Sequence, residues 1–532
     1  MAKQYLPFVA AALSCCANVT VEQRPNILFI MSDDHTSQAI GVYGSRLAAL
    51  DPTPTIDRIG DEGIVMENAF CTNSISTPSR ANIITGEYSQ TNGIRILDTP
   101  LPIEKQNLPR EMKQLGYETA IVGKWHLGNT PEEFDYYNVY YGQGQYFNPI
   151  LAEKGSTDST MVNYLGKSRR PGRKYKGHES DVITDISLDW LENKRDKSKP
   201  FFLCHQFKAP HDKFEFNPRY ADYLEDVEIP EPSSLWDNEE NGSVGTRGYN
   251  DSLIDTIGSS IGRRNVIRNK NSELKMKLPD TLSDDEYKHT LYQEYLKRYL
   301  RCVKGVDDNV KRIFDYLKQN DMMDNTIIIY AGDQGFMLGE HDYQDKRWMY
   351  EESMRMPFMV RYPKHIKAGS RSDAIVNNVD YAETIIDMAG GDVPQYMQGD
   401  SFKSILYNEG REPEGWKQST YYRYWMHMSN GHSNPAHFGV RTKDYKLIFF
   451  YGVNFDDYAP PRSLSAFQTP AAWELYDMKN DPEELHNIYG KAGYEEVTKQ
   501  LKAELLRLRK INNEGDDSYP HIQEIIDDNW DK

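Results

Sequence analysis

Apolar segments that end abruptly in charged or amide side chains place the tightest constraint on how this chain folds. Residues 24–33 form such a segment, an apolar run that closes on a carboxylate. An unbroken apolar run of this kind is typical of a parallel strand that is buried on both faces. Similar runs occupy 119–123, 200–205 and 326–331, and helical patterns occupy 54–63, 108–116 and 306–317. Strands that alternate with helices predict an α/β domain built on a large, mostly parallel sheet with helices on both faces.

At 532 residues, the chain is too long for one compact domain. We predict a catalytic domain over 24–405 and a smaller domain of antiparallel strands and helix over 410–525. Segments after the predicted boundary are rich in aromatic and β-branched residues or have a helical pattern: 419–425, 445–450 and, for the helix, 497–511. Two stretches lack periodicity and are interpreted as polar surface insertions in the sheet: 155–180 and 232–290.

The first 20 residues have the shape of a secretory signal, with one lysine, a short apolar stretch and then small residues. Leu13-Ser14-Cys15-Cys16 resembles a bacterial lipoprotein cleavage site. We therefore expect export, either to the periplasm or to a lipid anchor at the cell surface. The alternative is a short hydrophobic strand or helix of the mature protein.

The other three cysteines have neither zinc-like nor disulfide-framework spacing: Cys71, Cys204 and Cys302.

Charge limits the partners of this chain. Its 62 basic and 80 acidic side chains give a formal net charge of −18. A broadly acidic surface repels nucleic acids and anionic membranes, so we expect no nucleic-acid partner and no membrane contact except through a lipid anchor.

The ends of the predicted strands carry the chemistry. Because the carboxyl ends of parallel strands meet at one edge of a sheet, we expect their side chains to lie together. These side chains are Asp33, Asp34, Lys124, His126, His211, Asp333 and Gln334. Each has an ordinary alternative as a helix cap, a turn or a surface loop residue.

Together, however, these residue types suit one kind of site. Carboxylates and an amide are hard oxygen ligands for calcium or magnesium. Lys124 and Lys346 can neutralise an anion, and His126 and His211 can exchange protons with it. The pattern indicates a metal site that hydrolyses an anionic ester.

Ser76-Thr77-Pro78-Ser79-Arg80, followed by Thr85-Gly86, resembles the signature of the formylglycine-dependent sulfatases of the alkaline-phosphatase-like superfamily. Further blocks resemble that family in order and spacing: 24–34, 123–128, 209–211, 332–335, 345–346 with 350–352, and 474–477 with 481–484. The resemblance covers about residues 24–510.

The resemblance implies a role for each site residue. A maturation enzyme would oxidise Ser76 to formylglycine, whose hydrated aldehyde attacks the sulfur of a sulfated sugar. Arg80 would fix residue 76, His126 would assist release of sulfate from it, and His211 would protonate the leaving alcohol. Calcium would be held by Asp33, Asp34, Asp333, Gln334 and residue 76, and the sulfate by Lys124, His211 and Lys346.

The sequence departs from the family pattern at two positions. Gln334 stands where Asn or His is more usual, and it offers the same amide carbonyl on a longer arm. Ser76 stands where many members have Cys. It belongs either to a natural serine-type sulfatase or to an engineered, inactive replacement of Cys.

For the sugar, 135–149 is similar to bacterial sulfatases that resemble N-acetylglucosamine-6-sulfatases. We single out His427 and His437 in the second domain as sugar contacts, although the aromatic residues beside them can equally form that domain's core. We expect exo-acting hydrolysis of the 6-O-sulfate of glucosamine or N-acetylglucosamine in heparan-type fragments. The alternatives are a sulfatase for another sulfated position, a phosphate or phosphonate ester hydrolase, and an inactive glycan-binding homologue with unmodified Ser76.

Overall fold

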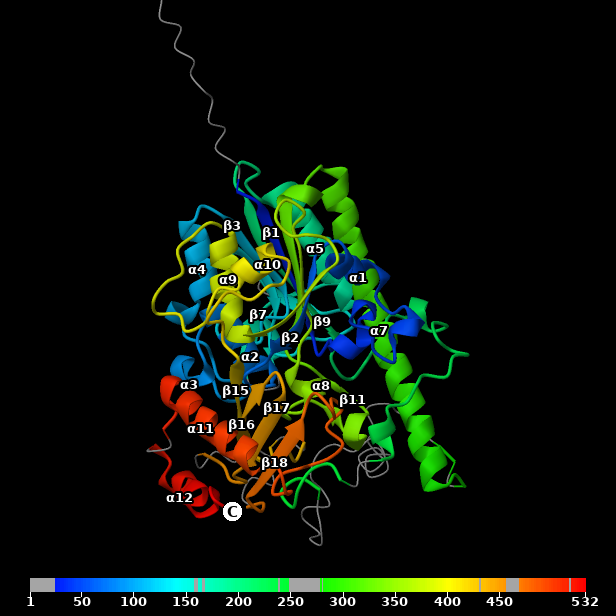
Figure 1. Cartoon of the computed structure of the whole chain (residues 1–532). Coiled ribbons are helices and arrows are strands. Elements are labelled where there is room, and N and C mark those ends of the chain that lie inside the picture. Colours follow the sequence, from blue (N-terminus) through cyan, green and yellow to red (C-terminus); the bar gives the residue numbers. More distant parts are fainter. Residues whose placement is uncertain are drawn as a thin grey trace, which may run out of the picture.

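A computed structural model describes most of the chain (Figure 1). The described residues are 24–156, 161–164, 168–237, 240–247, 278–279, 281–429, 432–455, 468–515 and 518–532. The predicted signal at residues 1–20 lies outside them. Among the helices described, none combines the length and the apolar character needed to cross a membrane.

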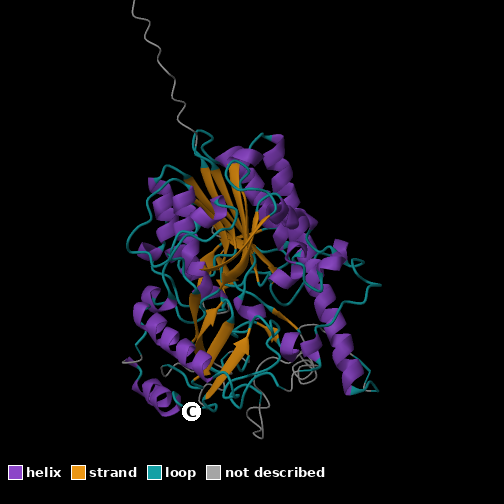
Figure 2. Cartoon of the chain, viewed as in Figure 1, coloured by secondary structure: helices purple, strands orange, loops and turns teal. Residues whose placement is uncertain are grey.

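The larger part of the molecule is organised around one large sheet (Figure 2), which has ten strands. In spatial order its strands are β14 (Ser370–Asn377), β2 (Ile64–Phe70), β13 (Phe358–Arg361), β10 (Thr326–Gly332), β1 (Asn26–Asp33), β9 (Phe201–Pro210), β3 (Glu118–Gly123), β4 (Tyr136–Tyr140), β5 (Ile150–Glu153) and β8 (Arg173–Lys174). The five strands from β10 to β4 are parallel, and β13 and β5 run in the opposite direction. The prediction of a mostly parallel sheet is confirmed.

Helices cover both faces of this sheet (Figure 1). One face packs against α1 (Pro54–Asp61), α5 (Glu179–Asp189) and α7 (Asp284–Gln319). The other packs against α2 (Ser76–Thr85), α4 (Asn107–Gln114), α9 (Tyr381–Met388) and α10 (Lys403–Tyr407). Successive residues of β1 enter opposite clusters, Leu28 and Ile30 on one side and Ile27 and Phe29 on the other. This alternation explains why the strand has no polar face.

Helix α7 is much longer than the sequence pattern predicted. We expected a helix over 306–317 after a polar insertion at 232–290, whereas α7 begins at Asp284, behind a capping box on Ser283. Tyrosines fill many of the buried positions in its first half. Because tyrosine carries a hydroxyl group, the helical periodicity of apolar residues is hard to recognise there in the sequence. Tyr299 shows the arrangement, because its ring is buried and its hydroxyl donates to the Asp34 carbonyl over 2.7 Å.

A separate four-stranded antiparallel sheet lies beyond the main sheet (Figure 1). It consists of β15 (Ser419–Tyr424), β16 (His437–Thr442), β17 (Tyr445–Phe450) and β18 (Ala472–Asp477). Helix α11 (Glu495–Ile511) packs on it through Leu501, Leu505 and Leu508, and α12 (Pro520–Asn529) adds Ile522 and Ile526 to the same cluster. The predicted domain boundary between 405 and 410 lies at the end of α10.

Candidate active site

The carboxyl edge of the main sheet gathers the predicted acidic side chains. Asp33 is the last residue of β1, and Asp34 follows it in the left-handed region with φ of 64°. Because β1 and β10 are paired in register up to Ser32 and Gly332, Asp333 leaves β10 beside them. The Asp34 N–H donates to Asp333 Oδ1 over 3.1 Å.

Ser76 enters this acidic cluster from α2, of which it is the first residue. Its Oγ donates to Asp33 Oδ1 over 3.1 Å. The amino end of a helix carries partial positive charge, so this position favours an anion bound beside residue 76.

Arg80, one turn further along α2, joins the ends of three strands. Its Nε donates to Asp333 Oδ2 over 2.9 Å. One of its terminal nitrogens donates to the Lys124 carbonyl over 2.8 Å and to Gln206 Oε1 over 2.7 Å. The guanidinium is buried, so these contacts hold α2 and residue 76 in place relative to the sheet.

Gln334 gives the clearest sign that these residues fit a metal ion. Its amide nitrogen donates to Asp34 Oδ1, whereas its Oε1 is buried and has no hydrogen-bond partner among the described residues. A buried carbonyl oxygen without a partner is costly unless it binds a cation or water. With Asp33, Asp34 and Asp333 beside it, the donor set consists of hard oxygens, as calcium or magnesium requires.

Burial and neighbouring charges set the protonation of these acids. Burial and the adjacent Asp33 carboxylate raise the pKa of Asp333 to about 7, against the pull of Arg80. Burial also raises the pKa of Asp34, despite Lys346 and His211 nearby. Burial acts on Asp33 in the same sense, but Lys124, His211 and Arg80 overcome it and hold its pKa well below the usual range. Carboxyls with raised pKa values gain from a bound cation, which displaces their protons.

Two buried lysines flank the carboxylates, as the sequence predicted. Lys124 follows β3 and forms an ion pair with Asp33, and it donates to Gln143 Oε1 over 2.7 Å. Lys346 forms an ion pair with Asp34 at 2.6 Å. Both ammonium groups are therefore placed where they can bind an anion that sits over the metal ligands.

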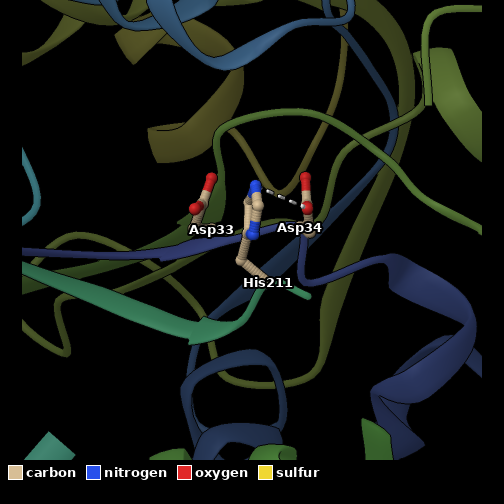
Figure 3. Close-up of side chains that lie close together, drawn as sticks. All are labelled: Asp33, Asp34 and His211. Atoms are coloured by element: carbon tan, nitrogen blue, oxygen red, sulfur yellow. Dashed lines mark ion pairs between the residues drawn. The ribbon is translucent and has the colours of Figure 1, made fainter. Parts of the chain in front are cut away.

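The two predicted histidines differ in their surroundings. His211 lies between Asp33 and Asp34 in Figure 3, with its Nε2 3.7 Å from Asp34 Oδ2 and its Nδ1 2.6 Å from Asp212 Oδ1. His126 Nε2 lies 3.2 Å from Asp98 Oδ1, and its Nδ1 is buried without a hydrogen-bond partner among the described residues. Burial lowers the pKa of His126 to about 4, so its ring is neutral at pH 7.

The two histidines predicted as sugar contacts are buried in or beside the small sheet. His437 begins β16 and is fully buried, with its ring centroid 4.7 Å from that of Phe450 and 5.5 Å from that of Tyr422. His427 is also fully buried, and its Nδ1 accepts a hydrogen bond from the Ala436 N–H over 3.1 Å. This packing favours the alternative, in which they belong to the core of the small sheet, and their contact with a sugar stays a prediction.

A polar cluster next to Lys346 was missed at the sequence level. Asp345 Oδ2 lies 3.0 Å from His432 Nδ1 and 2.9 Å from Arg347 Nε. Arg347 in turn donates to the Tyr424 hydroxyl over 3.1 Å. His432 and Tyr424 belong to the segment that carries the small sheet, so this cluster joins that segment to the lysine of the anion site. The left-handed backbone of Asp345 and Arg347, with φ of 80° and 85°, has no signal in the sequence pattern.

A mostly parallel sheet whose carboxyl edge gathers buried carboxylate and amide oxygens beside two buried lysines is the arrangement of one class, the alkaline-phosphatase-like ester hydrolases. Within that class, the family description "Sulfatase" matches residues 25–391, and "N-sulphoglucosamine sulphohydrolase, C-terminal" matches residues 339–511. The chain belongs to the sulfatase family and is a sulfuric ester hydrolase. The predicted fold class and family are thereby confirmed.

Known proteins resemble the chain over most of its length. An N-acetylglucosamine-6-O-sulfatase of Bacteroides thetaiotaomicron is 38% identical over 544 aligned positions, which cover 96% of this chain and 91% of that protein. A solved structure of a protein in complex with its substrate, D-glucosamine-2-N,6-O-disulfate, has a TM-score of 0.79 and 36% identity and covers 93% of this chain and all of the other. The human N-acetylglucosamine-6-sulfatase is 27% identical over 409 positions, which cover 72% of this chain and 64% of that protein.

Proposed function

We propose that this protein removes the 6-O-sulfate from N-acetylglucosamine or glucosamine at the end of heparan-type fragments. The observation that carries the proposal is one buried cluster, in which Ser76 contacts Asp33, both Asp333 and Gln334 contact Asp34, and Lys124 and Lys346 flank the carboxylates. The choice of sugar rests on the Bacteroides N-acetylglucosamine-6-O-sulfatase and on the solved complex with a 6-sulfated glucosamine.

Two groups would complete the site. Calcium, held by Asp33, Asp34, Asp333, Gln334 and residue 76, would draw charge from the sulfate oxygens. Oxidation of Ser76 to formylglycine by a maturation enzyme would supply a hydrated aldehyde as the nucleophile. Arg80 would keep residue 76 facing the sulfur through its contacts with Asp333 and Gln206.

The remaining residues bind the ester and move protons. Lys124 and Lys346 would bind sulfate oxygens and stabilise the charge that develops on them. His211 Nε2 faces the acidic cluster, and Asp212 at its Nδ1 orients the ring, so His211 would donate a proton to the sugar alcohol as it leaves. His126, neutral and fixed by Asp98, would accept a proton from a hydroxyl of residue 76 at its Nδ1 and so assist release of sulfate.

The polar cluster of Asp345, Arg347 and His432 would recognise the sugar ring. A primary sulfate protrudes from its ring, so a narrow anion site can receive it while hydroxyl groups meet polar side chains at the mouth. His432 keeps 16% of its side-chain surface exposed and Asp345 keeps 13%, so both remain accessible to a ligand. We place the sugar contacts here in preference to the buried His427 and His437.

A panel of monosaccharides tests the specificity. The sugars carry sulfate at O2, O3, O4, O6 or N, in gluco and galacto forms, and released sulfate is measured. Preferred release from 6-sulfated glucosamine or N-acetylglucosamine is expected. Release from a galactosamine or uronic acid sulfate, with none from 6-sulfated glucosamine, would defeat the sugar assignment and leave the sulfatase family unaffected.

A second measurement separates the rival functions. The peptide that contains Ser76, taken from the native host, should be lighter than the unmodified peptide by two hydrogens. Its full mass would favour a glycan-binding protein in which Ser76 stays unmodified. Comparing turnover of sulfate and phosphate aryl esters separates the sulfatase from a phosphate or phosphonate ester hydrolase.

We also propose export to the periplasm or to a lipid anchor, on the pattern of residues 1–20. Fractionation of the native host, with detection of the chain in each fraction, tests this location.

A further inference from the structure

A second cluster of buried polar side chains, none of them among the predicted active-site residues, lies where the small sheet meets the main domain. It borders a cleft of about 580 Å³, which is lined by residues of both parts, among them Glu340 and Glu352 from one and Arg441 and Glu483 from the other. Three potential metal ligands converge beneath this cleft: His341, Glu352 and Glu484. Their ligand atoms all lie within 4.8 Å of one another.

His341 is the observation that points to a ligand. Its side chain is fully buried, yet neither ring nitrogen has a hydrogen-bond partner among the described residues. Its backbone is held on both sides, because its N–H donates to Ser234 Oγ over 3.0 Å and its carbonyl accepts from Arg247 over 3.0 Å. The backbone of His341 is therefore held in a left-handed conformation with φ of 56°. The ring that it carries makes no hydrogen bond of its own with the described residues.

Glu352 has the same shortage of partners. Its carboxylate is 90% buried, and Oε2 has no hydrogen-bond partner within the described parts of the chain. It lies 3.9 Å from His341 Nε2. That distance is too long for a hydrogen bond, and it is about half an ångström longer than the ~3.3–3.4 Å between two ligand atoms of a tetrahedral zinc ion, so the two side chains would move slightly together on binding.

The charges around the cluster leave one carboxylate uncompensated. Glu484 Oε1 lies 2.6 Å from Lys446 Nζ, and Glu351 Oε1 lies 3.0 Å from the same ammonium group and 2.7 Å from Arg441 Nε. Of these three carboxylates, Glu352 is the one that forms no ion pair with a lysine or arginine among the described residues, although Arg247 and Arg355 add positive charge to the surroundings. A buried carboxylate in this position requires either a proton or a cation.

Protonation of the two central residues is compatible with a cation. Burial, with the charges of Arg247 and Lys446, holds the pKa of His341 well below its usual range, so the ring is neutral and one of its two nitrogens has an electron pair to share with a cation. Burial, with the nearby Glu340 and Glu484, raises the pKa of Glu352. A cation that binds there would displace the Glu352 proton into solvent.

We propose that His341, Glu352 and Glu484 form a second, structural metal site that takes a divalent cation of the zinc type. One imidazole and two carboxylates are ligands that Zn²⁺ accepts, and water from the cleft can supply a fourth. Lys446 would then retain Glu351 as its partner. Because Glu484 follows β18 and the other two ligands belong to the main domain, the ion links the two parts of the molecule.

The test is metal content after equilibrium dialysis of the full chain against Zn²⁺. Wild type should retain one zinc more per chain than His341→Gln or the isosteric Glu352→Gln. The active-site variant Asp34→Asn should keep this zinc, which separates it from any ion held at the active site. His289→Gln is the matched control, because His289 also pairs with a glutamate but is 43% exposed, and this variant should keep the zinc too.

Thermal unfolding gives a readout that does not depend on activity. Zn²⁺ should raise the melting temperature of wild type and Asp34→Asn, and it should have no such effect on Glu352→Gln. Using Glu352→Gln keeps the test valid if His341→Gln does not fold. Equal zinc content and equal melting shifts in wild type and Glu352→Gln would overturn the proposal and leave the cluster as a water-filled polar network.

Discussion

Replacement of Lys124 by methionine tests the anion site most directly. The side chain is fully buried, and among the described residues its ammonium group hydrogen-bonds or pairs with Asp33 and Gln143. Methionine keeps most of its length and removes its charge. Loss of one donor aimed at transition-state charge costs ~2.7–4 kcal/mol, so kcat should fall about 10²–10³-fold.

The pH dependence makes this prediction sharper. Burial lowers the pKa of Lys124 to about 8, although Asp33 opposes the shift. The ammonium group is charged below that pH and neutral above it, so wild-type activity should decline on the alkaline side of about 8. Lys124→Arg, whose guanidinium stays charged across this pH range, should lose this alkaline decline even if it turns over more slowly.

The assay is kcat and KM for 6-sulfated N-acetylglucosamine, measured with protein shown to carry formylglycine, alongside unfolding by denaturant. Lys417→Met is the matched control, because Lys417 forms an ion pair with buried Asp380 at 2.6 Å in another part of the fold. It should lose stability and keep kcat. A folded Lys124→Met enzyme with less than about a tenfold loss, under ~1.4 kcal/mol, would refute the role given to this lysine.

Three further outcomes are expected. Asp333→Asn should lose the metal and its turnover together, as measured by metal content and released sulfate; full activity in excess chelator would contradict this. His437 is buried with a pKa lowered to about 3, so its contribution to stability is present above pH ~6.5 and is lost as pH falls, by ~2 kcal/mol at pH 5. Below pH 6.5, His437→Phe should therefore lose unfolding free energy less steeply with falling pH than wild type does. An equal slope in the two proteins would contradict the role given to His437. Leu505→Ala, at a fully buried position on α11, should cost ~2–5 kcal/mol of stability with kcat nearly unchanged; a loss below ~1 kcal/mol would show that α11 packs loosely.

The acidic part of the site could be predicted because local pattern and general topology suffice for it. Runs such as 24–33 and 326–331 can only be buried strands, and parallel pairing brings Asp33 and Asp333 to one edge. Ser76 was identified by family resemblance, and the helix that carries it was not predicted, since its residues are buried all round and show no amphipathic face.

Other features depend on contacts that no local pattern encodes. Asp345 and His432 are 87 positions apart in the chain, and they meet because the small sheet docks beside Lys346. His437 stands at a strand end, as predicted, but position along a strand does not tell whether the ring faces a ligand or an aromatic core. The first half of α7 was not predicted because its buried face is rich in tyrosine, which is apolar in its ring and polar only at its hydroxyl group.

The complete burial of α2 determines when the chain can be activated. Ser76 is 1% exposed, and the nine residues that follow it in the helix are buried as well. Because this segment is buried, a maturation enzyme could not bind it in the folded protein. Any oxidation of Ser76 would therefore take place before α2 packs against the sheet. Folding and modification would then compete for the same nascent segment. In a host where folding is faster than modification, the protein would be stable but inactive. Its Ser76 would stay unmodified because the maturation enzyme cannot reach it in the folded state.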